Sequence, residues 1–140
     1  MLPGTIDYSF TRLLTAADVQ PLFRQTTWAN SRNDADVERM LPASVNIGAW
    51  DGDQLVGYAR VITDGIFRAF LEDVVVDEAY RGQRIGEEMV RRLLERVAHV
   101  EDVILTTGEN RRAFYTRLNF HAFEHVHMHT KAPEQPAENN

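Results

Sequence analysis

The sequence contains no cysteine, which excludes disulfide bonds, thiolate-ligated zinc sites and a cysteine nucleophile. It also lacks any apolar run of about 20 residues, the length that a membrane-spanning helix needs. The opening MLPGTIDYSF has neither the basic nor the apolar region of a signal peptide. The sequence therefore predicts a cytoplasmic protein with no membrane segment.

Basic residues are fewer than acidic residues: the chain has 15 lysine and arginine residues and 21 aspartate and glutamate residues. The formal net charge of -6 has the wrong sign for a surface that neutralises nucleic-acid phosphates, so nucleic acid is not expected as a partner. An acidic surface instead attracts cationic molecules such as amines.

The composition is otherwise typical of a globular protein. Hydrophobic residues make up 44% of the 140 residues, enough for one sizeable core. We expect a single domain over residues 1–130. Residues 131–140 contain two prolines and no apolar cluster, so we expect a disordered tail there.

Alternating and helical hydrophobic periods predict an α/β fold. The turn Asp51-Gly52-Asp53 separates two apolar runs, which is typical of an antiparallel hairpin. The uninterrupted run Val74 to Val76 predicts a strand buried on both faces, near the centre of a sheet. The predicted elements are, in chain order, a strand within residues 5–14, helices over 15–26 and 34–41, strands over 44–50, 54–63 and 69–76, a helix over 84–98, a strand over 102–107, a helix over 110–118, and a strand or hairpin over 121–130.

The helix over residues 84–98 has the clearest pattern, with apolar residues at helical spacing and charged residues on the other side. Because strands precede and follow it, the three elements predict a right-handed βαβ unit with parallel strands.

A turn with two glycines, Arg81-Gly82-Gln83-Arg84-Ile85-Gly86, opens this helix. Such a turn aims unpaired backbone N–H groups and the positive end of the helix dipole at one point, where a phosphate fits. Gly82 allows a conformation that a Cβ would strain, and Gly86 lets the helix approach the sheet or a ligand closely. The turn equally fits a plain strand-to-helix connection. Neither GxxxxGK[ST] nor GxGxxG, the common nucleotide motifs, occurs in the chain.

The block from Leu71 to Gly86, followed by Asn110 to Phe120, resembles the GNAT superfamily of N-acetyltransferases. The resemblance is close from residue 48 to residue 120, and the order of elements extends it to nearly the whole chain. It implies a GNAT-like acyl-CoA N-acyltransferase fold, in which a central mixed sheet of six to seven strands is flanked by about four helices. It also implies acetyl-CoA as the cosubstrate.

The family's loop pattern, Q/R-x-x-G-x-G/A, is matched here by Arg81 and Gly86. Its first glycine position is occupied by Arg84. We expect Arg84 to keep helical φ and ψ and to offer its N–H all the same.

The resemblance also implies how the cofactor is held. The pantetheine arm would pair with strand backbone like an added strand, and an N–H near Val74 or Val75 would hold the thioester oxygen as negative charge develops. The valine side chains are core residues in either case, and Asn110 equally fits a helix N-cap. The cofactor-binding residues expected are Val74, Val75, Val76, Arg81, Gly82, Gln83, Arg84, Ile85, Gly86, Asn110 and Phe114.

Tyr115 stands where the family's leaving-group acid occurs. A phenol with a pKa of about 10 can protonate a departing thiolate whose conjugate acid has a pKa of about 8.5. Without the resemblance, Tyr115 fits a core residue with a solvated hydroxyl.

An amine acceptor must lose a proton during attack, which requires a carboxylate or an ordered water. Glu72 and Asp73 are the candidate carboxylates. Alternation along a strand places them on opposite faces of the sheet. We favour Glu72 as base or water-positioning residue and Asp73 as a structural or substrate-orienting acid.

The acceptor pocket in related enzymes is built from the loop of the first helices and the central strands. The corresponding residues here are Trp28, Arg32, Tyr58, Phe67 and Phe70. An aromatic wall suits an aryl or alkyl amine, although core packing explains each aromatic residue almost as well.

Three alternating histidines, His125, His127 and His129, would share one face of a strand. No carboxylate at suitable spacing completes a metal site, so no metal is predicted.

The predicted reaction is direct transfer of an acetyl group to a primary amine of a small molecule, such as an aryl or alkyl amine or a polyamine. The alternatives are another acyl group, an amino-sugar or peptide acceptor, and a non-catalytic CoA-sensing module that binds a protein partner. Related proteins are often dimers, so the resemblance also allows a homodimer.

Overall fold

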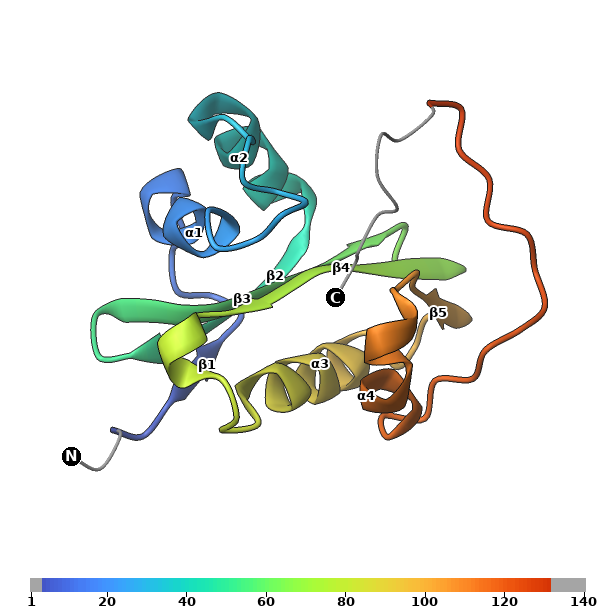
Figure 1. Ribbon diagram of the computed structural model, residues 1–140. Coiled ribbons are helices and arrows are strands. Elements are labelled where there is room, and N and C mark those ends of the chain that lie inside the picture. Colours follow the sequence, from blue (N-terminus) through green and yellow to red (C-terminus); the bar gives the residue numbers. More distant parts are fainter. Residues whose placement is uncertain (1–3, 132–140) are drawn as a thin grey trace.

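The computed structural model describes residues 4–131, and it shows one mixed sheet between two layers of helices (Figure 1). The strands are β1 (Asp7–Ser9), β2 (Val45–Asp51), β3 (Gln54–Thr63), β4 (Arg68–Val76) and β5 (Asp102–Ile104). The helices are α1 (Ala16–Phe23), α2 (Asp34–Met40), α3 (Ile85–Arg96) and α4 (Arg112–Thr116), with short 3-10 turns η1 (Leu41–Ala43), η2 (Glu78–Tyr80) and η3 (Glu109–Arg111).

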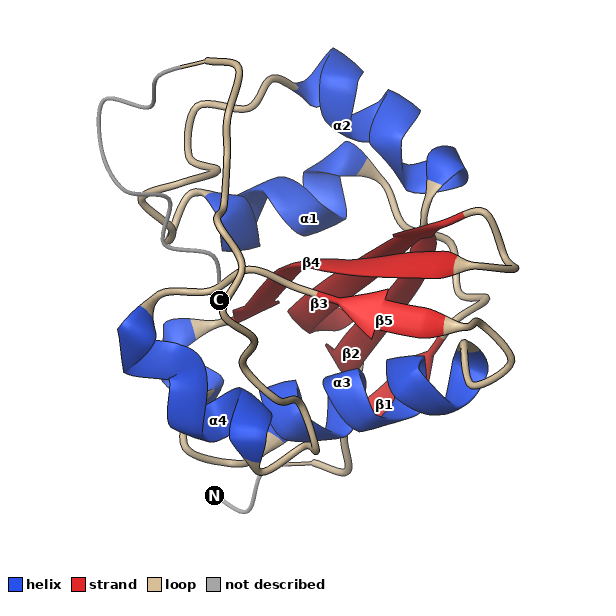
Figure 2. Cartoon of the chain, turned by 90° about the vertical axis from the view of Figure 1, so that its right-hand side faces the viewer, coloured by secondary structure: helices blue, strands red, loops and turns tan. Residues whose placement is uncertain are grey.

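The strands lie in the order β1-β2-β3-β4-β5. All neighbours are antiparallel except β4 and β5, which are parallel and are connected through α3. This confirms the predicted βαβ unit and the hairpin of β2 and β3. Helices α1 and α2 cover one face of the sheet, and α3 and α4 lie on the other (Figure 2).

Each helical layer has its own apolar core. On one face, α3 buries Ile85, Met89, Val90 and Leu93, which recur at the three-to-four-residue spacing of an amphipathic helix. On the other face, α1 buries Val19, Leu22 and Phe23 under the same spacing rule. Thr15 caps α1, because its side chain accepts from the N–H of Asp18 while the Asp18 carboxylate accepts from the N–H of Thr15.

The sheet is smaller than expected. It has five strands instead of six to seven, because residues 121–130 pair with no strand in the described part of the chain. β5 ends at Ile104 and not near residue 107, and β4 is the last strand but one, so it is not at the centre. The prediction of a strand or hairpin over residues 121–130 is therefore wrong for this structure.

None of the helices between residues 4 and 131 has the length and apolar character needed to cross a membrane. The expected disordered tail falls, apart from Lys131, outside the described residues.

Candidate active site

The edge of β4 that faces β5 is open along its second half. β5 pairs with β4 only at Arg68, Ala69 and Phe70. From Leu71 onward, β4 has β3 as its only strand partner among residues 4–131. A sheet edge of this kind offers backbone N–H and C=O groups to an extended ligand that adds as a strand.

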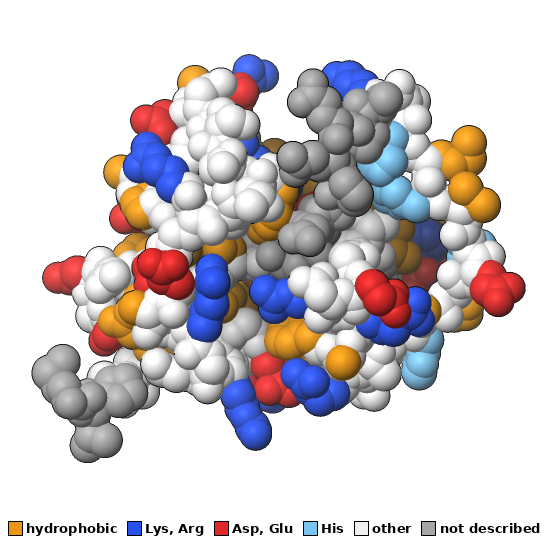
Figure 3. Space-filling view, viewed as in Figure 1, with side chains coloured by type: hydrophobic (Ala, Val, Ile, Leu, Met, Phe, Trp, Pro, Cys, Tyr) orange, Lys and Arg blue, Asp and Glu red, His pale blue; other side chains and the backbone are white. Residues whose placement is uncertain are grey.

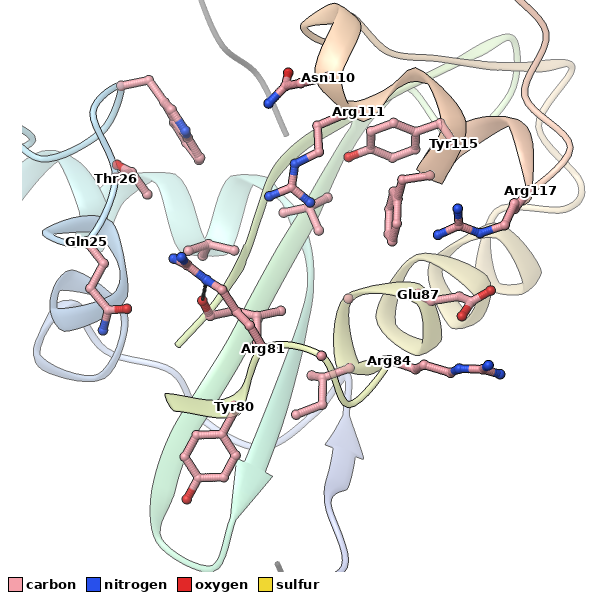
Figure 4. Close-up of a pocket in the computed structure, with 18 of the residues that line it drawn as sticks. Gln25, Thr26, Tyr80, Arg81, Arg84, Glu87, Asn110, Arg111, Tyr115 and Arg117 are labelled. Atoms are coloured by element: carbon pink, nitrogen blue, oxygen red, sulfur yellow. Dashed lines mark hydrogen bonds between the residues drawn. The ribbon is translucent and has the colours of Figure 1, made fainter. Parts of the chain in front are cut away.

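A cleft of about 490 Å³ opens beside this edge, a volume typical of small-molecule sites. It lies between β4, the segment that follows α1, the start of α3, and α4 (Figure 4). The residues that line it are Gln25, Thr26, Thr27, Trp28, Val74, Val75, Val76, Tyr80, Arg81, Gly82, Arg84, Ile85, Gly86, Glu87, Asn110, Arg111, Phe114, Tyr115 and Arg117.

The N-terminus of α3 enters the cleft without a side-chain cap. Arg84 is the N-cap residue and makes no capping hydrogen bond. The first hydrogen bond of the helix runs from the backbone N–H of Glu88 to the carbonyl of Arg84. The backbone N–H groups of Ile85, Gly86 and Glu87, which precede it, therefore have no partner inside the helix. These N–H groups and the helix dipole together form a site suited to an anion.

The two turn glycines have different roles. Gly82 has a φ of +82°, a left-handed backbone that a side chain strains, and a Cβ added there would meet no atom within 4 Å. Gly86 has no such constraint. Its added Cβ would lie 3.6 Å from a Val76 methyl group and 3.7 Å from the Phe114 ring, which are ordinary contacts. Helix packing therefore does not require glycine at position 86, and the missing side chain leaves more of the cleft open at the start of α3.

The expectation that Arg84 keeps helical angles is wrong. Its φ of 63° and ψ of 22° are left-handed. The chain must reverse its hand here to pass from the turn into α3, which is why glycine suits this position in the loop pattern. An arginine in this conformation costs about 1 kcal/mol relative to a relaxed backbone.

Four arginines and one glutamate are the charged residues of the lining, in a chain whose net charge is -6. Arg81 is held in place by donating from Nε to the carbonyl of Val76 at 3.2 Å, and Arg111 extends toward the centre of the cleft in Figure 4. Figure 3 shows basic side chains on this same face of the molecule. Because arginine binds phosphate groups through several donors at once, the cleft is suited to a polyanion.

Tyr115 is 3% exposed, and its hydroxyl end points away from α4 into the cleft (Figure 4). The rings of Phe114 and Phe120 hold it edge-on, with centroids 4.9 and 5.8 Å away. Burial raises the pKa of Tyr115; the charge of Arg111 lowers that pKa, and the charge of Glu72 raises it. Tyr115 is therefore protonated near neutral pH and able to donate. Tyr115 can be both a core residue and a proton donor, because its ring is packed in the core while its hydroxyl faces the cleft.

A β-bulge in β4 changes the expected placement of the two acids. Between the pairs Tyr58–Val75 and Arg60–Glu72, β3 advances by two residues and β4 by three. The extra residue is Asp73, whose φ is 57°. Alternation therefore fails here, and the prediction that Glu72 and Asp73 face opposite sides of the sheet is wrong. Consistent with this, Arg60 is paired directly opposite Glu72 and also donates to Asp73, which places both acids on the face of Arg60.

The Asp73 carboxylate is paired with two arginines. The side chain is fully buried, and it accepts hydrogen bonds from Arg32 at 2.8 and 3.2 Å and from Arg60 at 2.6 Å. The Arg32 guanidinium also lies 4.9 Å from the Phe23 ring centroid and 5.9 Å from that of Trp28. Asp73 thereby fastens the segment after α1, which includes Trp28, to the bulge beside the cleft.

Glu72 is half-buried and lies outside the lining of the cleft, within electrostatic reach of Tyr115. Desolvation raises the pKa of Glu72 and the charge of Asp73 adds to this rise, while Arg60 and Arg32 lower it. A carboxyl whose pKa is raised in this way is a better proton acceptor than an ordinary surface glutamate.

Of the five residues expected to form the acceptor pocket, only Trp28 lines the cleft. Arg32 lies behind the cleft against Asp73. Tyr58 is a core residue whose hydroxyl donates to Asn46 at 2.6 Å. Phe67 is 57% exposed in the turn before β4, and Phe70 pairs with Ile104 of β5, away from the cleft.

Of the expected cofactor-binding residues, only Gln83 is outside the lining. Seven further lining residues were not predicted from the sequence: Gln25, Thr26, Thr27, Tyr80, Glu87, Arg111 and Arg117. Of these, Arg111 and Arg117 could have been predicted, because both lie in the block from Asn110 to Phe120 that resembles the family.

The three histidines lie in the exposed segment after α4. Within residues 4–131 no group of three or more histidine, aspartate or glutamate side chains is arranged to hold a metal ion.

Comparison with known proteins identifies the family. Residues 11–120 match the profile of the acetyltransferase (GNAT) family, and the chain belongs to this family. Among solved structures, a GNAT-family acetyltransferase from Streptococcus pneumoniae TIGR4 superposes with a TM-score of 0.73 and 25% identity, covering 91% of this chain and 98% of that one. The GNAT-like fold is thereby confirmed.

Two curated relatives match over only part of their length. Protein ElaA of Escherichia coli K12 is 28% identical over 92 residues, which cover 62% of this chain and 60% of ElaA. Histone acetyltransferase TAP1 of Glycine max is 36% identical over 73 residues, which cover 49% of this chain and 31% of TAP1. The chain thus spans less than two thirds of either relative.

Proposed function

We propose that the protein is an acetyl-CoA-dependent N-acetyltransferase that acetylates a primary amine of a small molecule. One observation carries the proposal: the open edge of β4 runs from the Tyr115 hydroxyl to the uncapped N-terminus of α3, with four arginines around the cleft. This arrangement matches an extended ligand with a reactive group at one end and phosphates at the other.

Acetyl-CoA supplies the thioester that is broken when the amine attacks the acetyl carbon. The open edge of β4 holds the extended arm, and a backbone N–H near Val74 or Val75 stabilises the negative charge on the carbonyl oxygen. Glu72 accepts the proton of the amine, directly or through a water, and Tyr115 protonates the departing thiolate. No covalent bond to the protein is required.

The acceptor side of the cleft supports a small amine. Trp28 provides an aromatic surface there, and Thr27 provides a hydroxyl group without charge, while the Thr26 hydroxyl is already bonded to the backbone of Phe23 and Ala29. A thiol-release assay with acetyl-CoA and a panel of alkyl amines, aryl amines, polyamines, amino sugars and peptides tests this proposal. Turnover with small amines is expected. Binding of acetyl-CoA without turnover on any amine would instead support a CoA-sensing module.

Replacing Gly82 by valine is expected to weaken acetyl-CoA binding by at least tenfold and to leave the protein folded. A β-branched residue disfavours the left-handed turn that aims the α3 N–H groups at the diphosphate, while its Cβ meets no other atom. Gly65→Val is the matched control, because Gly65 has a φ of +77° and equally open surroundings but does not line the cleft. Calorimetry should show weaker binding for Gly82→Val alone. Equal affinities of the two variants would refute the role of the turn.

The fall of kcat/KM at low pH, the acid limb of the pH profile, should be caused by protonation of Glu72. Because burial raises its pKa above the usual 4.5, Glu72 becomes protonated and inactive as a base at a pH where surface glutamates are still ionised. We expect kcat/KM to fall as the pH drops through that raised pKa. Glu72→Gln should lower kcat by about 10²-fold and remove this limb. Glu87→Gln, at the other end of the cleft, should keep the limb. An unchanged profile in Glu72→Gln would assign the base elsewhere.

A further inference from the structure

Arg111 lines the cleft with a guanidinium that no group among residues 4–131 holds by a hydrogen bond or an ion pair. Arg81, in contrast, donates to the Val76 carbonyl at 3.2 Å, and Arg84 points away from the centre of the cleft in Figure 4. The planar fork of donors in an arginine matches a carboxylate or a phosphate. Arg111 is therefore available to an anionic group of a ligand.

The side chain of Arg111 lies at the Tyr115 end of the cleft. Arg111 belongs to η3, which leads directly into α4, and in Figure 4 its side chain and the Tyr115 hydroxyl extend into the same part of the cleft. Burial raises the pKa of Tyr115 and the positive charge of Arg111 lowers it, so the guanidinium is within electrostatic reach of the phenol. The proposed diphosphate site at the start of α3 has Arg81 and Arg84 of its own. Arg111 is therefore placed for a group beside the reacting atoms.

Glu72 places the opposite charge near the same hydroxyl. Besides burial, the negative charge of Glu72 raises the pKa of Tyr115. A molecule at the Tyr115 hydroxyl therefore meets a carboxylate from β4 and a guanidinium from η3. This pair of charges complements a small acceptor that has both an amino group and an acidic group. It disfavours an acceptor with a second cation in place of the acidic group, such as a polyamine.

The neighbouring arginines do not share this role. Arg32, expected from the sequence in the acceptor pocket, is paired with buried Asp73 at 2.8 Å and lies outside the lining of the cleft. Arg112, which follows Arg111 in the chain, pairs with Glu109 at 2.9 Å and also lies outside the lining. Arg111 is therefore the arginine placed to meet an acidic group of the acceptor.

We propose that Arg111 binds a carboxylate of the acceptor, and that the acceptor is an amino acid or another small amine with a carboxylate next to the amino group. The proposal rests on the acetyl transfer proposed above and specifies its substrate class. With the carboxylate on Arg111, the neutral amino group attacks the acetyl carbon, an N–C bond forms and the C–S bond of acetyl-CoA breaks. Glu72 takes one proton from the nitrogen, directly or through a water, and Tyr115 gives one proton to the sulfur. The products are the N-acetyl amino acid and CoA, and a proton returns from Glu72 to Tyr115 through solvent.

Paired acceptors test the carboxylate site by steady-state kinetics. Glycine, alanine, leucine and phenylalanine are each compared with the corresponding amide, which keeps the amino group and the side chain but lacks the negative charge. Arg111→Gln should lower kcat/KM for the amino acids by about tenfold or more relative to the amides. Taking this ratio in each protein removes the different intrinsic reactivity of the two amines. Arg111→Lys, which keeps the charge, should recover part of the loss.

Arg112→Gln is the matched control, because it removes a neighbouring arginine that does not line the cleft. It should keep the ratio of the unmodified protein. Because Arg111 is exposed, Arg111→Gln should keep the melting temperature and the affinity for acetyl-CoA. Equal ratios in the unmodified protein and Arg111→Gln would overturn the proposal. If Arg111→Gln instead bound acetyl-CoA more weakly with the ratio unchanged, Arg111 would contact the phosphates of acetyl-CoA and not the acceptor.

Calorimetry without turnover separates this proposal from the proposed function. The protein saturated with CoA is titrated with the same amino acids and with their amides. Tighter binding of the amino acids that is lost in Arg111→Gln supports the carboxylate site even if no amine is acetylated, in which case only the proposed function fails. Acetylation of amides and amino acids alike, unaffected by Arg111→Gln, would support the proposed function and overturn the carboxylate site.

Discussion

Tyr115→Phe is expected to lower kcat by about 10²-fold or more, with little change in the affinity for acetyl-CoA. The substitution removes the hydroxyl that lines the cleft but keeps the ring between Phe114 and Phe120, so the fold should be unaffected. Without a proton donor, the thiolate must leave as an anion in a partly buried site, which raises the barrier. Steady-state kinetics with the best amine of the panel measures the change.

Tyr80→Phe is the matched control for this substitution. Tyr80 also lines the cleft, but its hydroxyl donates to Asp51 at 2.6 Å and lies at the end of β4 away from Tyr115. The same loss of a phenolic hydroxyl should therefore leave kcat nearly unchanged. If Tyr115→Phe retained full activity, or if the two variants lost activity equally, Tyr115 would not be the leaving-group acid.

Asp73→Asn is expected to lower the free energy of unfolding by about 3 kcal/mol. The Asp73 side chain is fully buried between two arginines, whose side chains are 13% exposed for Arg60 and 32% for Arg32. Removing the carboxylate charge leaves Arg60 buried without its counter-ion. Because Arg32 can partly return to water, the effect should be at the lower end for a buried ion pair. Asparagine tolerates the positive φ of position 73, so the backbone adds little to the loss.

Urea unfolding of Asp73→Asn and Asp53→Asn compares a buried carboxylate with an exposed one. Asp53 pairs with Arg12 at 3.5 Å on the surface, where an ion pair contributes little. Only Asp73→Asn should shift the midpoint substantially. Similar midpoints for the two variants would contradict the structural role of Asp73.

The elements that the sequence predicted well are those whose hydrophobic pattern is local. The spacing of Ile85, Met89 and Leu93 defined α3, and the turn around Gly52 defined the hairpin of β2 and β3. The resemblance located the turn at Gly82 and the position of Tyr115 because each lies inside a contiguous block of matching residues.

Features that depend on pairing between strands were not predictable in the same way. The bulge at Asp73 appears only when β4 is aligned with β3, so alternation within β4 alone misplaced the two acids. Tyr58 and Phe67 have similar aromatic character in the sequence, yet one is buried in the core and the other lies on the surface. The left-handed Arg84 was missed because its conformation follows from the path between the turn and α3, not from its own propensity.

The N-terminus of α3, with the turn before it, is the proposed site for the diphosphate of acetyl-CoA. Calorimetric titration of the unmodified protein with acetyl-CoA and, separately, with S-acetylpantetheine measures the contribution of this site directly, because the second compound has the same reactive arm without phosphates. We expect one-to-one binding of acetyl-CoA and binding of S-acetylpantetheine that is weaker by at least 10²-fold. Equal affinity for the two compounds would contradict this assignment.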